Sequence, residues 1–246
     1  MQSIGIDVGS TYTKYCVMAD DGAVRFFIER TPVRQRDYFK KTLARFAIEY
    51  PNYKIISCGY GKHNIEAVKK ISELTALAIG LNHQLPGCSV ALDIGGQDTK
   101  LIRQYGGEIK EFFVNDKCAA GSGLFLTNVL NILDVRFEEI NLACAVDVSD
   151  IKLSSVCAVF AQSEIVELLA NDIAPQKIII AVIRQILIQA SSLLNKCEHI
   201  GEVVLSGGLT KIKGINEFAT NILDERIIIP NNPQHLSAIG CAVIGR

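Results

Sequence analysis

The chain has 246 residues, 49% hydrophobic content and a formal net charge of −1, so it can bury a substantial core and is not disordered. No run of lysine and arginine exceeds two residues, which excludes a basic nucleic-acid face and a polybasic membrane patch. Eight cysteines in a chain of this length, with no signal-peptide pattern at its start, favour reduced thiols, and we expect a cytoplasmic protein.

The first distinctive element is a polar turn between two strand-like runs. An apolar run, Ser3 to Ile6, leads into Asp7-Val8-Gly9-Ser10-Thr11-Tyr12-Thr13-Lys14, which we call the first carboxylate turn. The pattern predicts a β-hairpin with a carboxylate near its tip. Glycine lets the backbone approach a ligand closely or adopt a positive φ, and successive exposed N–H groups in such a turn bind anions.

Strand-like and helix-like segments alternate after this turn. Strands are predicted at Val24–Ile28 and Lys54–Cys58, and helices at Arg36–Glu49 and Ile65–Leu81. This part of the chain therefore indicates a mixed α/β domain.

The same turn then occurs a second time. Ser89 to Leu92 leads into Asp93-Ile94-Gly95-Gly96-Gln97-Asp98-Thr99-Lys100, the second carboxylate turn. One Asp-x-Gly hairpin is an ordinary turn, but two matched copies in one chain indicate a duplication. The pair resembles the phosphate-1 and phosphate-2 loops of the actin, sugar-kinase and heat-shock-chaperone superfamily. That resemblance implies two ribonuclease-H-like α/β domains, residues 1–87 with 234–246 and residues 88–233, with an ATP cleft between them.

The second half continues with a hairpin and several helices. Gly106-Gly107 predicts a tight turn between a strand at Ser89–Arg103 and a strand at Glu108–Asn115. Helices are predicted at Gly123–Leu133, at Ala158–Ala170 and from Pro175 onward. The last of these carries an apolar stripe that indicates core packing: Ile179, Val182, Ile186, Ala190 and Leu193.

A Ser-Gly-Gly turn follows the next predicted strand, Glu202–Leu205. A strand that enters such a turn before a helix resembles the adenosine motif of the same superfamily, where bare glycine backbone lies against the nucleoside. The residues expected to line this pocket are Gly207, Gly208, Leu209 and Gln234. The remaining predicted elements are a helix at Ile215–Leu223, a strand at Arg226–Ile229 and a final helix from Leu236.

Two cysteines stand in unusual local sequences. Cys118 lies among small residues within Asn115–Gly123, Cys157 follows Ser154-Ser155, and both precede predicted helices. A helix N-terminus lowers the pKa of a thiol and favours a metal-bound thiolate. Because iron-sulfur clusters generally take four thiolates, two cysteines would suffice only if a two-fold dimer supplied a second pair.

The other cysteines fit a structural role, since free cysteine is among the most buried residue types. We assign this role to Cys16, Cys58, Cys88, Cys144, Cys197 and Cys241. On spacing alone, the same interpretation stays open for Cys118 and Cys157.

Together these motifs resemble the activators of 2-hydroxyacyl-CoA dehydratases, a family that also includes the ATPase subunits of benzoyl-CoA reductases. The resemblance spans nearly the whole chain and is most specific at Asn115–Gly123, which kinases of the same fold lack. It implies a homodimer with one 4Fe-4S cluster at the subunit interface, ligated by Cys118 and Cys157 of each subunit. It also implies ATP-driven transfer of one electron from a low-potential ferredoxin or flavodoxin to an iron-sulfur dehydratase or reductase.

Turn chemistry and the resemblance together indicate the nucleotide-binding groups. Backbone N–H groups of Ser10–Thr13 and Gly95–Gln97 are expected to hold the phosphates of ATP or ADP, with Lys14 adding positive charge. For Lys14 and Lys100, a role as solvated strand-end lysines remains the alternative.

The catalytic groups are expected to be Asp7, Asp93 and Gln97. The two aspartates would hold Mg²⁺ largely through water, and one of them would orient the attacking water.

Two other classes of protein share this opening motif. The first class is the small-molecule kinases of the pantothenate or N-acetylhexosamine type. Such a kinase needs a base beside a substrate hydroxyl, and Asp98 and Asp116 are the candidate bases in this sequence. A non-catalytic assembly module that binds ATP as a switch is the other, and the block around Cys118 argues against it. The chain has Leu77, Lys62 and Gln162 where the activators often have His, Arg and an acidic residue, which leaves open a double-cubane-cluster reductase as acceptor.

Overall fold

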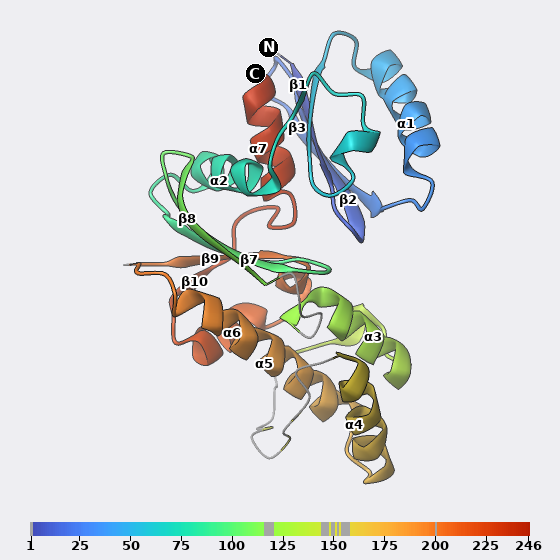
Figure 1. Ribbon diagram of the computed structural model, residues 1–246, viewed down its shortest axis with the longest axis vertical. Helices are drawn as coiled ribbons and strands as arrows, with labels where there is room; N and C mark the ends of the chain where they lie inside the picture. Colours follow the sequence, from blue (N-terminus) through green and yellow to red (C-terminus); the bar gives the residue numbers. More distant parts are fainter. Residues whose placement is uncertain are drawn as a thin grey trace. The chain divides into compact units, whose positions relative to one another are not determined.

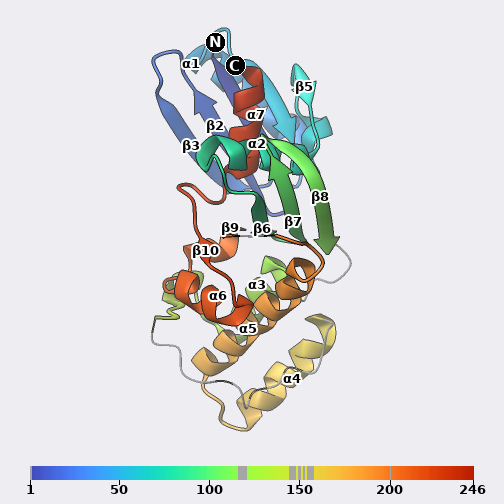
Figure 2. The same cartoon turned by 90° about the vertical axis from the view of Figure 1, so that its left-hand side faces the viewer.

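The computed structural model describes residues 2–115, 121–143, 148, 151, 153, 158–199 and 201–246. The chain divides into two compact units, one formed by Met1–Ser89, Ile102–Glu111 and Pro230–Arg246 and the other by Val90–Leu101 and Phe112–Ile229. Two five-stranded sheets, with strand orders β3-β2-β1-β4-β5 and β10-β9-β6-β7-β8, run through the described residues (Figures 1 and 2). The predicted α/β fold class is confirmed.

The first unit contains a sheet of parallel and antiparallel strands, with helices on both of its faces. Strand β1 pairs antiparallel with β2 and parallel with β4, while β2 pairs antiparallel with β3. Helix α1 covers one face, and helices α2 and α7 cover the other (Figure 1). The elements are β1 Ser3–Val8, β2 Tyr12–Met18, β3 Val24–Arg30, α1 Gln35–Glu49, β4 Lys54–Cys58, β5 Lys69–Lys70, α2 Glu73–Gln84 and α7 Leu236–Gly245.

Side chains alternate across β1, and this alternation fixes what each face of the strand does. Ile4, Ile6 and Val8 belong to the buried cluster that contains Phe39 of α1. On the opposite face, Ser3 Oγ donates to the carbonyl of Ala242 in α7 at 2.6 Å. Because the side-chain period of a strand is two, Asp7 lies on the α7 face with Ser3.

Helices α2 and α7 cross at two glycines. A Cβ placed on Gly80 would lie 1.9 Å from the carbonyl oxygen of Leu236, and one on Gly240 would lie 1.8 Å from that of Ala76. No side chain fits at either position, so the crossing requires glycine at both.

Replacing Gly240 by alanine is expected to lower the free energy of unfolding by about 2 kcal/mol or more, because the steric conflict exceeds the gain in helix propensity of about 1 kcal/mol. Urea denaturation followed by circular dichroism would measure this change. The control is His83→Ala at an exposed position of α2, where we expect a change within about 0.5 kcal/mol. Equal stability of Gly240→Ala and the wild type would contradict the described crossing.

The second unit places its helices on one side of its sheet (Figure 2). Strands β6 and β9 pair in parallel, as do β9 and β10. The predicted stripe on α5 is confirmed, since all five of its residues are buried in the core of this unit. The elements are β6 Val90–Ile94, α3 Gly123–Leu133, α4 Ala158–Ala170, α5 Pro175–Leu194, β9 Val203–Gly207, α6 Ile215–Leu223 and β10 Ile227–Ile228. Strands β7 Thr99–Tyr105 and β8 Glu108–Asn115 continue this sheet, although their residues within Ile102–Glu111 belong to the first unit.

One predicted helix was wrong over its first half. The sequence indicated a helix at Ile65–Leu81, but the helix begins at Glu73, and Lys69–Lys70 form the short strand β5 beside β4. Pairing of Lys69 with Ile56 and Lys70 with Ser57 extends the sheet by one strand, and this non-local pairing outweighs the local helical pattern.

By length and composition α5 could cross a membrane, but 61% of its most apolar window is buried within the protein. Among the described residues it is the single helix that meets that test. Its burial identifies it as the core helix of the second unit.

Candidate functional site

The first carboxylate turn joins β1 to β2 and places Asp7 beside Lys14. The two residues are opposite each other in the antiparallel register, and Lys14 Nζ lies 3.0 Å from Asp7 Oδ2. Asp7 is only 2% exposed, so this pair lies largely out of water, where attraction between opposite charges is less screened. Lys14 is thus an ion-pair partner of Asp7 and not a solvated strand-end lysine.

Thr31 fixes the tip of this turn. Its hydroxyl donates to the carbonyl of Gly9 at 2.8 Å, and its N–H donates to the carbonyl of Thr11 at 2.9 Å. Thr13 is buried, with its hydroxyl 3.0 Å from that of Thr31. Ser10 remains exposed at the tip. The side chain of Thr13 therefore holds the turn together, while the exposed backbone at the tip stays the predicted phosphate-binding part.

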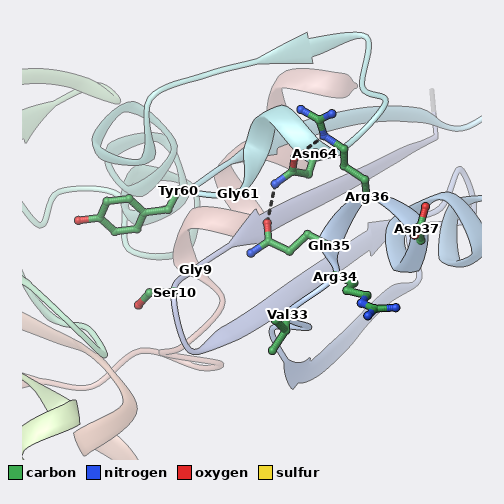
Figure 3. Close-up of a pocket in the computed structure, with 10 residues that line it drawn as sticks. All are labelled: Gly9, Ser10, Val33, Arg34, Gln35, Arg36, Asp37, Tyr60, Gly61 and Asn64. Atoms are coloured by element: carbon green, nitrogen blue, oxygen red, sulfur yellow. Dashed lines mark hydrogen bonds between the residues drawn. The ribbon is translucent and has the colours of Figure 1, made fainter.

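A pocket of about 540 Å³ opens beside this tip (Figure 3). Within it, the amide of Asn64 donates to Gln35 Oε1 at 2.7 Å and accepts from Arg36 Nε at 3.2 Å. Two arginines against one aspartate give the lining a positive balance, which suits an anionic group next to the turn. The lining residues are Gly9, Ser10, Val33, Arg34, Gln35, Arg36, Asp37, Tyr60, Gly61 and Asn64.

The second carboxylate turn joins β6 to β7 and holds a tighter charge cluster. Lys100 Nζ lies 2.6 Å from Asp98 Oδ1 and 3.9 Å from Asp93 Oδ2. Ser206 Oγ, from the neighbouring strand β9, donates to Asp93 Oδ1 at 2.6 Å. Lys100 is 5% exposed, so it too is an ion-pair partner and not a solvated lysine. One lysine between two carboxylates leaves the turn with a net negative charge.

The second turn is hydrogen-bonded directly to helix α3. The N–H of Gly123 donates to the carbonyl of Gly95 at 2.9 Å, and the N–H of Leu124 donates to the carbonyl of Gly96 at 2.8 Å. Thr99 Oγ1 also donates to the carbonyl of Gly121 at 2.5 Å. Backbone hydrogen bonds therefore join this turn to the first turn of α3 without an intervening side chain.

The glycines of these turns serve two different purposes. Gly9 and Gly95 do not adopt a positive φ, but a Cβ on Gly9 would lie 2.8 Å from the carbonyl oxygen of Tyr12, and one on Gly95 would lie 2.8 Å from Asp98 Oδ1. Gly207 has a φ of 98°, a conformation that favours glycine. Close approach explains the first two glycines, whereas Gly207 combines a positive φ with a close approach to the carbonyl oxygen of Ile94.

The hydrogen bonds of the second carboxylate turn exclude one of the N–H groups that were predicted to bind phosphate. The N–H of Gly95 donates to the carbonyl of Asp98 at 2.9 Å and closes the turn. Of the predicted donors Gly95–Gln97, the N–H groups of Gly96 and Gln97 stay predicted phosphate ligands, and the side chain of Gln97 is exposed.

The Ser-Gly-Gly turn lies at the end of β9. Gly208 begins a short 3₁₀ turn, Gly208–Lys211, and Leu209 is 2% exposed within the core of the second unit. The side chain of Leu209 therefore packs in the core. Gln234 belongs to the first unit, where it is half-buried just before α7. The nucleoside-binding role of Gly207, Gly208, Leu209 and Gln234 stays a prediction.

The two predicted cluster ligands, Cys118 and Cys157, lie outside the described residues, as does Cys144. Within the described part of the chain, no group of three or more His, Cys, Asp or Glu side chains is arranged to hold a metal ion. Of the other cysteines, Cys16, Cys58, Cys197 and Cys241 are buried, Cys88 is half-buried, and none of these five forms a disulfide with another described cysteine.

Two residues that contact the turn aspartates, Cys58 and Ser206, were not predicted as site residues, and Asp98 was predicted only as a candidate base and not as the partner of Lys100. Ser206 and Cys58 donate to Asp93 and Asp7 from adjacent parallel strands, and Asp98 pairs with Lys100. The signal in the sequence was a Cys-Gly pair in one copy and a Ser-Gly pair in the other. Each pair lies at the end of the strand that runs parallel to the strand carrying the aspartate. Finding it required knowing which strands pair, since Ser206 is far from Asp93 in sequence.

The fold and the two carboxylate turns define a class of protein, the actin-like ATPases. A solved structure of the activator of 2-hydroxyisocaproyl-CoA dehydratase from Clostridium difficile, with bound ADPNP, aligns with a TM-score of 0.89 and 28% identity, covering 100% of this chain and 94% of that one. A ROK family glucokinase from Streptomyces griseus aligns with a TM-score of 0.59 and 13% identity, a likeness of fold alone.

Sequence comparison identifies the family. The model of the BadF/BadG/BcrA/BcrD ATPase family matches residues 4–245, and the chain belongs to this family. It is similar to the activator of lactoyl-CoA dehydratase from Anaerotignum propionicum, with 33% identity over 251 residues, covering 99% of this chain and 96% of that protein. The predicted family is confirmed.

Proposed function

We propose that this protein is an ATP-dependent activator that delivers a low-potential electron to an iron-sulfur enzyme, either a 2-hydroxyacyl-CoA dehydratase or a double-cubane-cluster reductase. The observation that carries the proposal is the hydrogen-bonded link between Gly95-Gly96 and the first turn of α3. Helix α3 directly follows the segment that holds Cys118. A nucleotide that acts on the second carboxylate turn would therefore act on the backbone next to that cysteine.

The nucleotide would be held mainly by backbone. The N–H groups at the tips of the two carboxylate turns would take the phosphates, and the glycines of the Ser-Gly-Gly turn would take the nucleoside. These turns belong to the two duplicated domains, for which we propose residues 1–87 with 234–246 and residues 88–233.

Magnesium would be held through water, and the chemistry of the two carboxylates fits that arrangement. Each aspartate already has one oxygen beside a lysine ammonium and the other beside a thiol or hydroxyl donor. Mg²⁺ keeps several of its waters in proteins, so it does not need to displace these partners. Asp7 or Asp93 would orient the water that attacks the terminal phosphate.

Electron transfer would depend on Cys118 and Cys157. Two thiolates from each subunit of a homodimer supply the four ligands that a 4Fe-4S cluster requires, and the bound cluster would supply one-electron chemistry. In the sequence Cys118 and Cys157 precede α3 and α4, and we propose that the positions of these helices would respond to ATP or ADP. A ligand shifts such an equilibrium only by its differential affinity for the two states.

The proposed partners follow from this chemistry. A low-potential ferredoxin or flavodoxin would reduce the protein, and an iron-sulfur dehydratase or reductase in the cytoplasm would accept the electron. The activator of lactoyl-CoA dehydratase and the activator of 2-hydroxyisocaproyl-CoA dehydratase are the relatives that support this assignment.

A small-molecule kinase is the alternative that the fold allows. The likeness to a glucokinase is one of fold alone, and Asp98, one of the two candidate bases, is 5% exposed and paired with Lys100. The ion pair with Lys100 stabilises the charged form of Asp98 and occupies one of the oxygens that a substrate hydroxyl would need to reach. Asp116, the other candidate base, lies outside the described residues. The similarity to activators of 2-hydroxyacyl-CoA dehydratases therefore favours the activator over the kinase.

Purification without oxygen tests the proposal directly. We expect a brown protein with about four iron atoms per dimer and measurable ATP hydrolysis. A colourless, iron-free protein that transfers phosphate to pantothenate or an N-acetylhexosamine would refute it.

A further inference from the structure

The duplication in this chain includes more than the two carboxylate turns and the two strands that each turn joins. In each copy it also includes a third strand, β4 in the first unit and β9 in the second, which pairs with the strand carrying the aspartate. In the first unit, β1 pairs in parallel with β4, and Asp7 is opposite Cys58. In the second unit, β6 pairs in parallel with β9, and Asp93 is opposite Ser206. Cys58 and Ser206 therefore occupy the same position relative to the two aspartates.

The contacts made from these two positions are also the same. Ser206 Oγ donates to Asp93 Oδ1 at 2.6 Å, and Cys58 Sγ donates to Asp7 Oδ1 at 3.7 Å. In each unit a lysine lies beside the other oxygen of the same carboxylate, at 3.0 Å for Lys14 and at 3.9 Å for Lys100. Each aspartate is thus held between a lysine and a neutral donor.

A glycine with a positive φ follows each donor and keeps its strand close to the carboxylate strand. Gly59 has a φ of 84° and Gly207 a φ of 98°. A Cβ on Gly59 would lie 2.5 Å from the carbonyl oxygen of Val8, and one on Gly207 would lie 2.1 Å from that of Ile94. The third strand therefore ends in the same donor-glycine pair in both copies.

Cys58 is suited to act as a donor because its thiol stays protonated. The side chain is fully buried between the sheet and α7, and burial raises the pKa of the Cys58 thiol well above its usual range, with Cys241 and Asp7 adding to the effect. A neutral S–H group donates weakly, whereas a thiolate would repel the Asp7 carboxylate.

We infer that Cys58 is a positioning residue for Asp7, equivalent to Ser206 for Asp93, and that each donor fixes the orientation of its carboxylate during ATP hydrolysis. This inference rests on the proposed function. It assigns a role to a cysteine whose burial alone would make it a packing residue, and it makes a serine hydroxyl the natural substitute for the thiol.

Reciprocal substitutions test the inference. In Cys58→Ala and in Ser206→Ala, the kcat for ATP hydrolysis is expected to fall by about 10- to 100-fold, while the KM for ATP changes little. Cys58→Ser and Ser206→Cys keep a donor and are expected to restore most of that loss. The matched control is Cys16→Ala, which removes an equally buried thiol of the first unit and is expected to keep the wild-type kcat.

The outcomes separate a positioning role from packing. Equal kcat values for Cys58→Ala and Cys16→Ala, or a folded Cys58→Ser that remains as impaired as Cys58→Ala, would overturn the inference. The S–H stretching band in the infrared spectrum, assigned to Cys58 by its loss in Cys58→Ser, gives a second readout that needs no turnover. It is expected to shift in Asp7→Asn and not in Asp93→Asn, and an unchanged band would also overturn the inference. A wild-type protein that does not hydrolyse ATP but shows the band shift would refute the proposed function and leave Cys58 as the donor that orients Asp7.

Discussion

Replacing Asp93 by asparagine is expected to reduce the rate of ATP hydrolysis by about 10²- to 10⁴-fold, the range found when a group that orients or deprotonates a nucleophile is removed. The substitution removes one negative charge from a cluster of two carboxylates and one lysine. Lys100 keeps Asp98 at 2.6 Å, so the buried lysine retains a counter-ion and the fold should be preserved. The measurement is steady-state phosphate release in the presence of Mg²⁺.

Asp98→Asn is the matched control for Asp93→Asn. It removes the closer partner of a lysine that is 5% exposed, and breaking a buried ion pair in this way is expected to lower the free energy of unfolding by about 3 kcal/mol. We therefore expect Asp93→Asn to lose ATP hydrolysis while keeping its stability. We expect Asp98→Asn to lose stability. Full hydrolysis by Asp93→Asn would rule out a catalytic role for this carboxylate.

Replacing either Cys118 or Cys157 by serine is expected to remove the iron from anaerobically purified protein. An alkoxide is a far poorer ligand for iron than a thiolate, and in the proposed dimer one lost residue per chain would remove two of the four ligands. Nucleotide binding should survive, because none of the predicted phosphate donors changes. Iron analysis, the visible absorption spectrum and calorimetric binding of Mg-ADP would measure these effects.

Cys197→Ser provides the control for this experiment. Cys197 follows α5, is 6% exposed and belongs to the core of the second unit, so its replacement should leave the iron content unchanged. Loss of iron in Cys197→Ser, or full iron content in Cys118→Ser, would assign the ligands differently.

Local patterns in the sequence predicted most of the fold. The helices Gly123–Leu133, Ala158–Ala170 and Ile215–Leu223 agree with the structure at both ends, because turn residues and apolar periodicity mark them. The helix expected from Ile65 was wrong up to Glu73, because Lys69–Lys70 pair with β4. Such pairing depends on a strand elsewhere in the chain and leaves no local pattern.

The candidate site, too, was only partly predictable from local patterns in the sequence. The aspartates and glycines of the two turns were visible as a repeated motif, and their lysines are now seen as partners of those aspartates. The contacts of Cys58 and Ser206 were not visible, since they arise from parallel pairing between strands distant in sequence. The cluster ligands Cys118 and Cys157 lie outside the described residues, so their role stays a proposal that rests on the family and on thiolate chemistry.

The central claim is that ATP acts on the surroundings of a shared cluster. The most direct test is the rate at which a chelator removes iron from the anaerobic, reduced protein with Mg-ATP, with Mg-ADP and without nucleotide. We predict different rates with ATP and with ADP in the wild type, because under the proposed function the two nucleotides would favour different arrangements of the helices that follow the two cysteines. Rates that do not change with the nucleotide, in a protein that binds and hydrolyses ATP, would contradict the account.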